Sequence, residues 1–219
     1  MKNFLKSRLV ASAAIVAVSI AALTGCANVA EMSSLSTLSS QATVDQINQA
    51  ETIELKKSAI SIGDNWTVTA DGEKIAEIKG QAFYVAGDTY AMYSNNGDFL
   101  GAESENFKIL NSTADFYNHK GEVSGKLSQQ MLNMLHTFNL KDTEGETVAT
   151  LKQNFGLSLK GEIKDAEGVE SWEFSKSLVS IGASLKIEKL AESDVSAMDA
   201  IWMVTAVNEI DEARASKKN

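Results

Sequence analysis

Two histidines are the first residues whose side chains suggest chemistry. His119 lies two residues before Gly121, and His136 follows the apolar run 131–135. A zinc site needs a second ligand at short spacing, and the sequence places none beside either histidine. We therefore expect His119 to be a solvated turn residue and His136 to be a partly buried structural residue.

Serine nucleophiles and phosphate loops are not indicated either. The sequence holds neither Gly-x-Ser-x-Gly nor Ser-x-x-Lys, the patterns that supply a serine with a catalytic partner. Gly156 and Gly161 have the separation of a phosphate loop, but Glu162 stands where that loop requires lysine. The sequence thus predicts no catalytic residue and no cofactor.

Acidic residues gather in two places, one at Glu103 and Glu105 and one further along the chain. The second group comprises Asp165, Glu167, Glu170 and Glu173. Paired carboxylates can act as a general acid and base or bind calcium weakly, but the tight alternate spacing of a calcium loop is missing. We expect both groups to lie on solvated hairpin tips or strand faces, and we predict no metal site.

Two further sets of residues carry alternative interpretations. Asp199 follows Ser196 at the spacing of a helix capping box, so we favour a capping role over a ligand-facing acid. The aromatic side chains can fill a core or line a lipid pocket, and we favour core filling. They are Trp66, Trp172, Trp202, Phe83, Tyr84, Tyr90 and Tyr93.

The N-terminal residues predict an exported protein. Lys2, Lys6 and Arg8 form a cationic region, and an uncharged run of 15 residues ends at Leu23. A helix of this length reaches roughly 22 Å, less than the about 30 Å of hydrocarbon in a bilayer, which indicates a cleaved signal over residues 1–25. An ordinary secretory signal with a chance cysteine behind it is the alternative.

Leu23-Thr24-Gly25-Cys26 resembles the lipobox of bacterial lipoproteins. The resemblance implies that the Cys26 thiol carries diacylglycerol and that Cys26 is the mature N-terminus. A lipid there anchors the protein to a membrane. The expected location is the outer face of the cell membrane, or the outer membrane in a host with two membranes, because Ala27 replaces the aspartate of inner-membrane lipoproteins.

Charge excludes one class of partner and limits another. The full chain carries −9, and removal of the signal leaves 17 basic against 29 acidic residues, a net charge of −12. Such a chain lacks the basic surface that nucleic acid requires, and it repels anionic headgroups. Serines in 27–42 indicate a flexible spacer, so we expect a tether over 26–57, with a short amphipathic helix in 43–57 as the alternative.

The body of the chain predicts antiparallel strands followed by one helix. Segments such as Trp66–Ala70 alternate apolar and polar residues, and Asp71-Gly72 and Asn96-Gly97 are two-residue turn signals. Turn glycines recur about every 24 residues, at Gly72, Gly97, Gly121, Gly145 and Gly168. With strands near 58–62 and 184–190, we expect about twelve strands. The helix expected over 195–210 is apolar all round, so it should be buried inside a closed barrel.

This combination resembles the LURP-one-related proteins of the tubby C-terminal-like superfamily. The similarity rests on the Trp66-Thr67-Val68 strand, the turns at Gly72 and Gly97, and the apolar helix at 201–207. It covers about 58–212, leaves a polar tail at 213–219, and implies a twelve-stranded barrel around a central helix. Family members bind phosphoinositides through basic clusters, and this sequence has no such cluster to match.

Three functional hypotheses of different classes follow. The favoured one is a membrane-anchored envelope lipoprotein whose barrel is a non-enzymatic binding or scaffold module for an unknown protein or lipid ligand. The alternative is a lipid-binding or scramblase-like protein, motivated by the family resemblance. An envelope hydrolase with an unfamiliar site ranks last, because the sequence offers no catalytic set.

Overall fold

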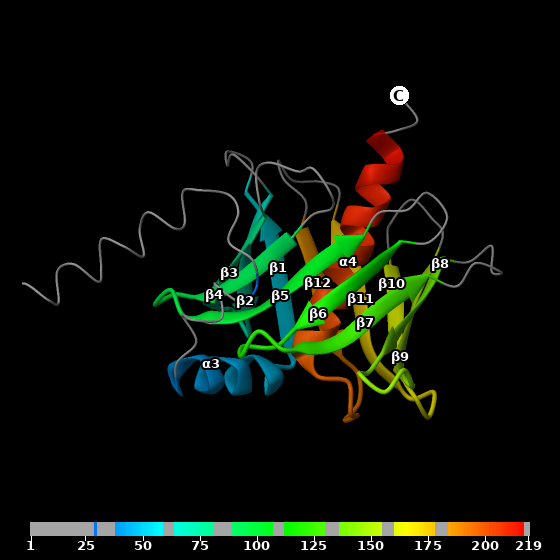
Figure 1. The fold of residues 1–219 in the computed structure, drawn as a ribbon, viewed down its shortest axis with the longest axis horizontal. Helices are drawn as coiled ribbons and strands as arrows, with labels where there is room; N and C mark the ends of the chain where they lie inside the picture. The colour runs from blue at the N-terminus through cyan, green and yellow to red at the C-terminus, as the bar shows by residue number, and fades with distance from the viewer. Residues whose placement is uncertain are drawn as a thin grey trace, which may run out of the picture.

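Twelve antiparallel strands form a closed barrel, as the sequence predicts (Figure 1). The computed structural model describes residue 29 and residues 38–58, 64–80, 89–106, 112–129, 136–154, 160–177 and 184–216. Each strand pairs with its neighbours in the chain, and β12 closes on β1 through pairs such as Leu55 with Leu185. The strands are β1 (Thr52–Lys57), β2 (Asn65–Ala70), β3 (Glu73–Gly80), β4 (Thr89–Ser94), β5 (Phe99–Asn106), β6 (Thr113–Tyr117), β7 (Val123–Gln129), β8 (His136–Lys141), β9 (Thr147–Asn154), β10 (Lys160–Asp165), β11 (Glu170–Ser177) and β12 (Ser184–Lys189).

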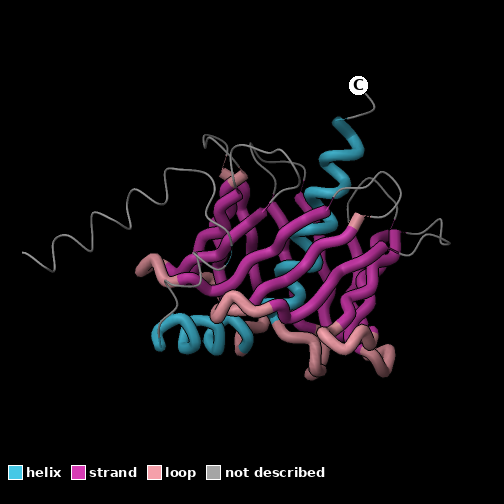
Figure 2. Tube along the Cα trace, viewed as in Figure 1, coloured by secondary structure: helices cyan, strands magenta, loops and turns pink. Residues whose placement is uncertain are grey.

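Helix α4 (Ala197–Ser216) runs through the barrel (Figure 2). Every residue from Ala200 to Ile210 is buried, which confirms the expectation of a central apolar helix. The helix continues six residues past Ile210, through most of the expected polar tail, and its last turns leave the barrel (Figure 1). Among the described helices, none is both long and apolar enough to cross a membrane.

The five predicted turn glycines lie at one end of the barrel, here called the turn end. All five have positive φ, the conformation in which glycine is least strained. Asp71 and Gly72 both have positive φ, as a two-residue turn requires, but at Asn96-Gly97 only Gly97 does. There the Gly97 N–H donates to the Ser94 carbonyl at 2.9 Å, so the loop has three residues, and the two-residue prediction is wrong.

The expected tether over 26–57 is wrong for its C-terminal half. Residues 38–48 form helix α3 (Leu38–Asn48), and 52–57 form β1. The strand expected near 58–62 lies, apart from Ser58, outside the described residues. Ile47 is fully buried in the core, and the Asn48 side chain accepts a hydrogen bond of 3.1 Å from the Met198 N–H. Serine-rich composition favours coil only where tertiary contacts are missing, and α3 has them because it packs at the turn end (Figure 1).

The barrel interior is one apolar core. Inward side chains of the strands, among them Phe116, Phe138 and Trp172, meet the side chains of α4. The opposite end of the barrel, where α4 leaves, is here called the exit end. The polar side chains of the interior gather toward the exit end, and they form the candidate site described below.

Candidate functional site

The predicted lipid-attachment residues Leu23, Thr24, Gly25 and Cys26 lie outside the described residues. Val29 is the first described residue after them, and it packs on the outside of the barrel rather than in solvent. Its partners are Ala91, Phe99 and Ala102, with Tyr93 and Tyr117 beside them. Val29 and this group are here called the outer aromatic cluster. The chain is therefore held against the β4–β6 wall three residues beyond the predicted lipid acceptor.

Helix α3 makes a second contact between the N-terminal part of the chain and the same region of the barrel. The Ser39 hydroxyl donates a hydrogen bond to the Asp98 carboxylate in the β4–β5 turn, and Ser40 is fully buried. The turn at Gly97 thus contacts α3. The two strands that this turn connects, β4 and β5, contact Val29. The chain between Val29 and α3 starts and ends on one part of the barrel.

Glu103 and Glu105 were expected on a solvated surface, and this expectation is wrong. Both lie on β5 and point into the barrel, with 0% and 3% of their surface exposed. Neither carboxylate oxygen of Glu103 has a hydrogen-bond partner in the described part of the chain. Burial, together with the negative charges of Glu105 and Glu209, raises the pKa of Glu103 well above its ordinary value. The interior of the barrel therefore contains a destabilising acidic cluster, Glu103, Glu105 and Glu209.

Glu209, on α4, connects this acidic cluster to a lysine. The Lys57 ammonium lies 3.5 Å from Glu209 and donates a 2.8 Å hydrogen bond to Glu212. Burial and the charge of Glu212 raise the pKa of Glu209 to about 7, although Lys57 and a hydrogen bond from Tyr90 oppose the shift. Burial disfavours the Lys57 ammonium, but Glu212 and Glu209 outweigh it and raise the pKa of Lys57.

Other polar side chains complete the contacts between α4 and the wall. Lys176 on β11 donates to Asn208 at 2.6 Å and to Glu212 at 3.1 Å, and Gln153 on β9 donates to Asp211 at 2.7 Å. Burial opposes ionisation of Glu212, but its bonds to Lys57 and Lys176 outweigh burial and lower its pKa. These contacts hold the exit half of α4 to three strands, so the structure gives this polar set a structural role.

Sequence reasoning missed Lys57 and Glu209. Lys57 was placed in the tether, and Glu209 fell within a helix judged by its apolar residues alone. The signal in the sequence is the pair Asn208-Glu209 inside an otherwise apolar helix. A polar residue at such a position must have a buried partner.

The second acidic group is spread over the β10–β11 turn and strand β11. The expectation that Asp165 is solvated is wrong: it is buried and caps its own turn, accepting a 2.8 Å hydrogen bond from the Val169 N–H. Glu167, Glu170 and Glu173 are exposed, as expected. Within the described residues, no group of three or more candidate ligands can hold a metal ion.

His119 and the capping pair lie where the sequence predicts them. His119 lies in the β6–β7 turn, whereas His136 begins β8 and its side chain lies outside the described part of the structure. The Ser196 hydroxyl accepts from the Asp199 N–H at 3.1 Å and donates to its carboxylate at 2.6 Å, which confirms the capping interpretation. Burial raises the pKa of Asp199, and the hydrogen bonds from Ser196 limit that rise.

Most of the predicted aromatic side chains fill the core. Trp66, Trp172, Trp202 and Tyr90 are buried, and the Trp172 indole N–H donates to the Val195 carbonyl at 2.9 Å. Tyr93 belongs instead to the outer aromatic cluster. The other two predicted positions, Phe83 and Tyr84, lie outside the described residues.

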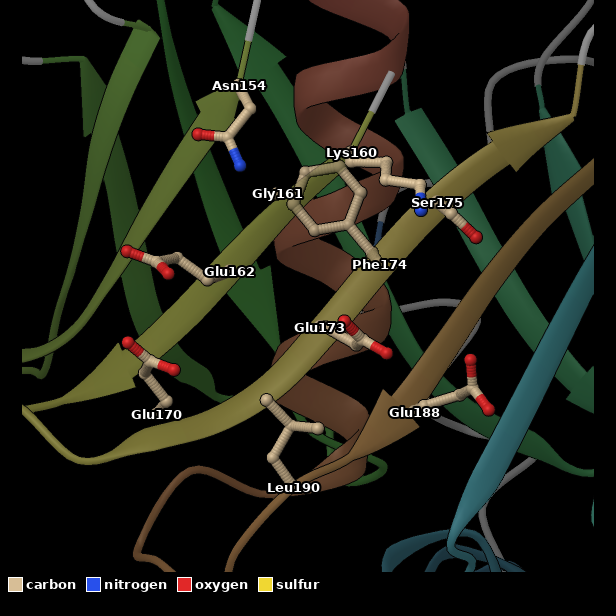
Figure 3. A pocket seen from close by; sticks show the side chains of 10 residues that line it. All are labelled: Asn154, Lys160, Gly161, Glu162, Glu170, Glu173, Phe174, Ser175, Glu188 and Leu190. Carbon is tan, nitrogen blue, oxygen red and sulfur yellow. The ribbon is translucent and has the colours of Figure 1, made fainter. Parts of the chain in front are cut away.

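A shallow groove lies on the outside of the barrel over β10–β12 (Figure 3). Its volume of about 190 Å³ is smaller than the about 300–1,000 Å³ of typical ligand pockets. Glu162, Glu173 and Glu188 line it from three neighbouring strands and face one another in register. An acidic wall of this kind repels anionic ligands.

Comparison with known proteins gives no family assignment. The chain matches no family model, and it matches no curated protein.

Proposed function

We propose that this chain is an envelope lipoprotein, anchored through a lipid on Cys26, whose barrel is a non-enzymatic binding or scaffold module. The observation that carries the proposal is the order of residues at the N-terminus. A cationic region and an uncharged run precede Leu23-Thr24-Gly25-Cys26, and Cys26 is the one cysteine of the sequence. The thiol is thus at the position where the lipobox requires it.

The filled barrel supports a binding or scaffold role more than a ligand-storage role. Helix α4 occupies the interior, so the outer wall presents the surface for partners. The described polar side chains at the exit end bind α4 to the barrel. A partner that binds the outer wall, such as another envelope protein, fits this arrangement.

The family proposal is a LURP-one-related, tubby-like domain. A closed barrel of twelve strands around a C-terminal helix is the architecture that the resemblance implies, and this agreement supports the proposal. The lipid-handling alternative receives less support. The described groove is small and acidic, whereas a phospholipid needs a long apolar channel and a site for its phosphate.

The lipid anchor is tested by Cys26→Ser, expressed with the full signal in a bacterium that processes lipoproteins. The wild type should incorporate a clickable palmitate analogue and sediment with membranes. The variant should incorporate none and accumulate as precursor or soluble protein. Cys26→Ser combined with Ser33→Cys is the matched control, because it restores a thiol at the wrong position and should remain unlabelled. Normal processing and membrane retention of Cys26→Ser would refute the anchor.

A further inference from the structure

The two sides of the barrel wall differ in charge. On β10–β12, Glu162, Glu173 and Glu188 point outward beside Lys164 and Lys186. On β4–β6, the described outward side chains are alanine, phenylalanine, tyrosine, serine and threonine, with Asp115 as the charged exception. Asp115 is paired with Lys126 at 3.2 Å. The β4–β6 wall is therefore the weakly charged side of an acidic protein.

This wall also carries the side chains that suit a membrane interface. Tyr93 is partly exposed and packs edge to face on the fully buried Phe99, with ring centroids 6.0 Å apart. On the adjacent strand β3, the ammonium of Lys79, which is paired with Glu77, lies 5.6 Å from the Tyr93 ring centre. Tyr117 adds a second tyrosine on the neighbouring strand. Tyrosine and lysine are both favoured at headgroup depth, because each has an apolar body and a polar tip.

Val29 connects this wall to the predicted lipid. It is packed in the outer aromatic cluster, and only Ala27 and Asn28 separate it from Cys26. A fully extended chain spans at most about 3.6 Å per residue, so the Cys26 Cα lies within about 11 Å of the Val29 Cα whatever its conformation. Acyl chains on Cys26 must therefore enter the bilayer close to the β4–β6 wall.

We propose that the barrel turns its β4–β6 wall toward the bilayer surface, fastened there by Val29, and its more highly charged β10–β12 wall toward solvent. The proposal rests on the proposed lipid at Cys26. Desolvation favours this orientation, because the β10–β12 wall would bring Glu162, Glu173, Glu188, Lys164 and Lys186 against the headgroups, whereas the β4–β6 wall brings Asp115 alone among its described outward side chains. One defined side of the barrel then faces the membrane at close range, and no long flexible spacer separates the two.

The test uses the lipidated full-length protein in vesicles of phosphatidylethanolamine and phosphatidylglycerol. Because the lipid occupies Cys26, an introduced cysteine is the one free thiol for a nitroxide label. Ser104→Cys labels the β4–β6 wall, and Ser175→Cys labels the β10–β12 wall. The two positions are matched, because each is partly buried and lies two residues before the end of its strand.

The measured quantity is the collision rate of each label with oxygen, which concentrates in the bilayer, relative to a water-soluble nickel chelate. We expect a severalfold higher ratio at Ser104→Cys than at Ser175→Cys. Equal ratios in protein that floats with the vesicles would overturn the orientation and leave the anchor intact. Protein that does not float would overturn the anchor, and the orientation with it.

Val29→Asp tests the fastening point. A charge at this partly buried position, set against an apolar cluster, should release the N-terminal segment from the outer aromatic cluster and remove the difference between the two labels, while the protein still floats. Val29→Ile should preserve the difference, since it keeps an apolar side chain. An unchanged difference in Val29→Asp would show that Val29 does not set the orientation.

Discussion

The Lys57 ammonium donates a 2.8 Å hydrogen bond to the Glu212 carboxylate and so joins the first strand of the barrel to its last helix, 155 residues away in the sequence. The same ammonium lies 3.5 Å from Glu209 on the next turn of α4 toward the core. Lys57 is thus one of the polar contacts that hold α4 at its depth in the barrel, together with those of Lys176 and Gln153.

Removing the Lys57 charge should destabilise the fold. At pH 8, Lys57→Met removes the positive charge that offsets the burial of the Glu209 carboxylate. We expect a loss of about 2 kcal/mol in the free energy of unfolding. The loss is smaller than for a fully buried ion pair, because solvent reaches Glu212. At pH 5 the loss should be smaller, since Glu209 is then protonated. Lys186→Met, which removes an exposed pair with Glu188, is the control and should leave stability nearly unchanged. Equal losses in both variants would contradict the role of Lys57.

Glu209 should make the fold less stable as pH rises. Its pKa of about 7 in the folded protein exceeds the ordinary 4.5, so the folded state binds more protons than the unfolded state between these values. The free energy of unfolding should therefore fall from about pH 4.5 to about pH 7, and Glu209→Gln should flatten that fall. Urea titrations of both proteins across this range measure the difference. Identical pH profiles would show that Glu209 ionises as freely as it does in water.

Glu103→Gln should stabilise the protein at pH 8. The substitution removes a carboxyl group that is fully buried and has a raised pKa, and it keeps the size of the side chain. We expect a gain of roughly 2 kcal/mol, or several degrees in Tm, at pH 8 and little change at about pH 3, where the carboxyl is neutral in both the folded and the unfolded state. Glu167→Gln, at an exposed turn, should leave Tm unchanged. Loss of stability at pH 8 would instead indicate that Glu103 is held by a favourable interaction.

Ser196→Ala should destabilise the start of α4 by about 1 kcal/mol. It removes the capping hydrogen bond to the Asp199 N–H and a hydrogen bond to the Asp199 carboxylate. Ser193→Ala is the matched control, because Ser193 accepts only from the Val195 N–H ahead of the helix. Thermal unfolding should rank Ser196→Ala below Ser193→Ala, and the reverse order would place the cap at Ser193.

Gly161→Ala should destabilise the barrel through a steric clash. A Cβ there lies 2.3 Å from the Phe174 ring and 2.5 Å from the Lys152 carbonyl oxygen, and overpacking of this kind costs about 1–3 kcal/mol. Adding Phe174→Leu should recover part of the loss, which thermal unfolding of the double variant measures. No recovery would assign the clash to the Lys152 backbone alone. Gly161, whose spacing from Gly156 resembles a phosphate loop that Glu162 rules out, is thus required by packing.

Some features were predictable because they depend on neighbours in the chain. Alternation along β2 predicted a half-buried strand, the glycines of the turn end were recognisable from their spacing, and Ser196 and Asp199 showed the spacing of a cap. Each follows from backbone conformation within a few residues. The three-residue loop at Gly97 was missed, because the pairing of β4 with β5 contains a bulge that sequence alone does not reveal.

The candidate sites were less predictable, because local alternation does not say which face of a strand becomes the inside. Glu103 alternates with Ala102 and Ser104 as an exposed residue would, and only closure of the barrel around α4 buries it. Serines near α3 indicated a spacer, and only the packing of Ile47 against the turn end makes that segment a helix.

By itself, the sequence determined the antiparallel strands after residue 64 as a class, the apolar helix and the predicted lipid acceptor at Cys26, since these depend on residue type and short spacing. The tertiary structure decided which charges meet and where the N-terminal segment lies. Lys57 and Glu212, and Val29 and Phe99, are far apart in the sequence, and their contacts form only when the strands close in one register around the helix.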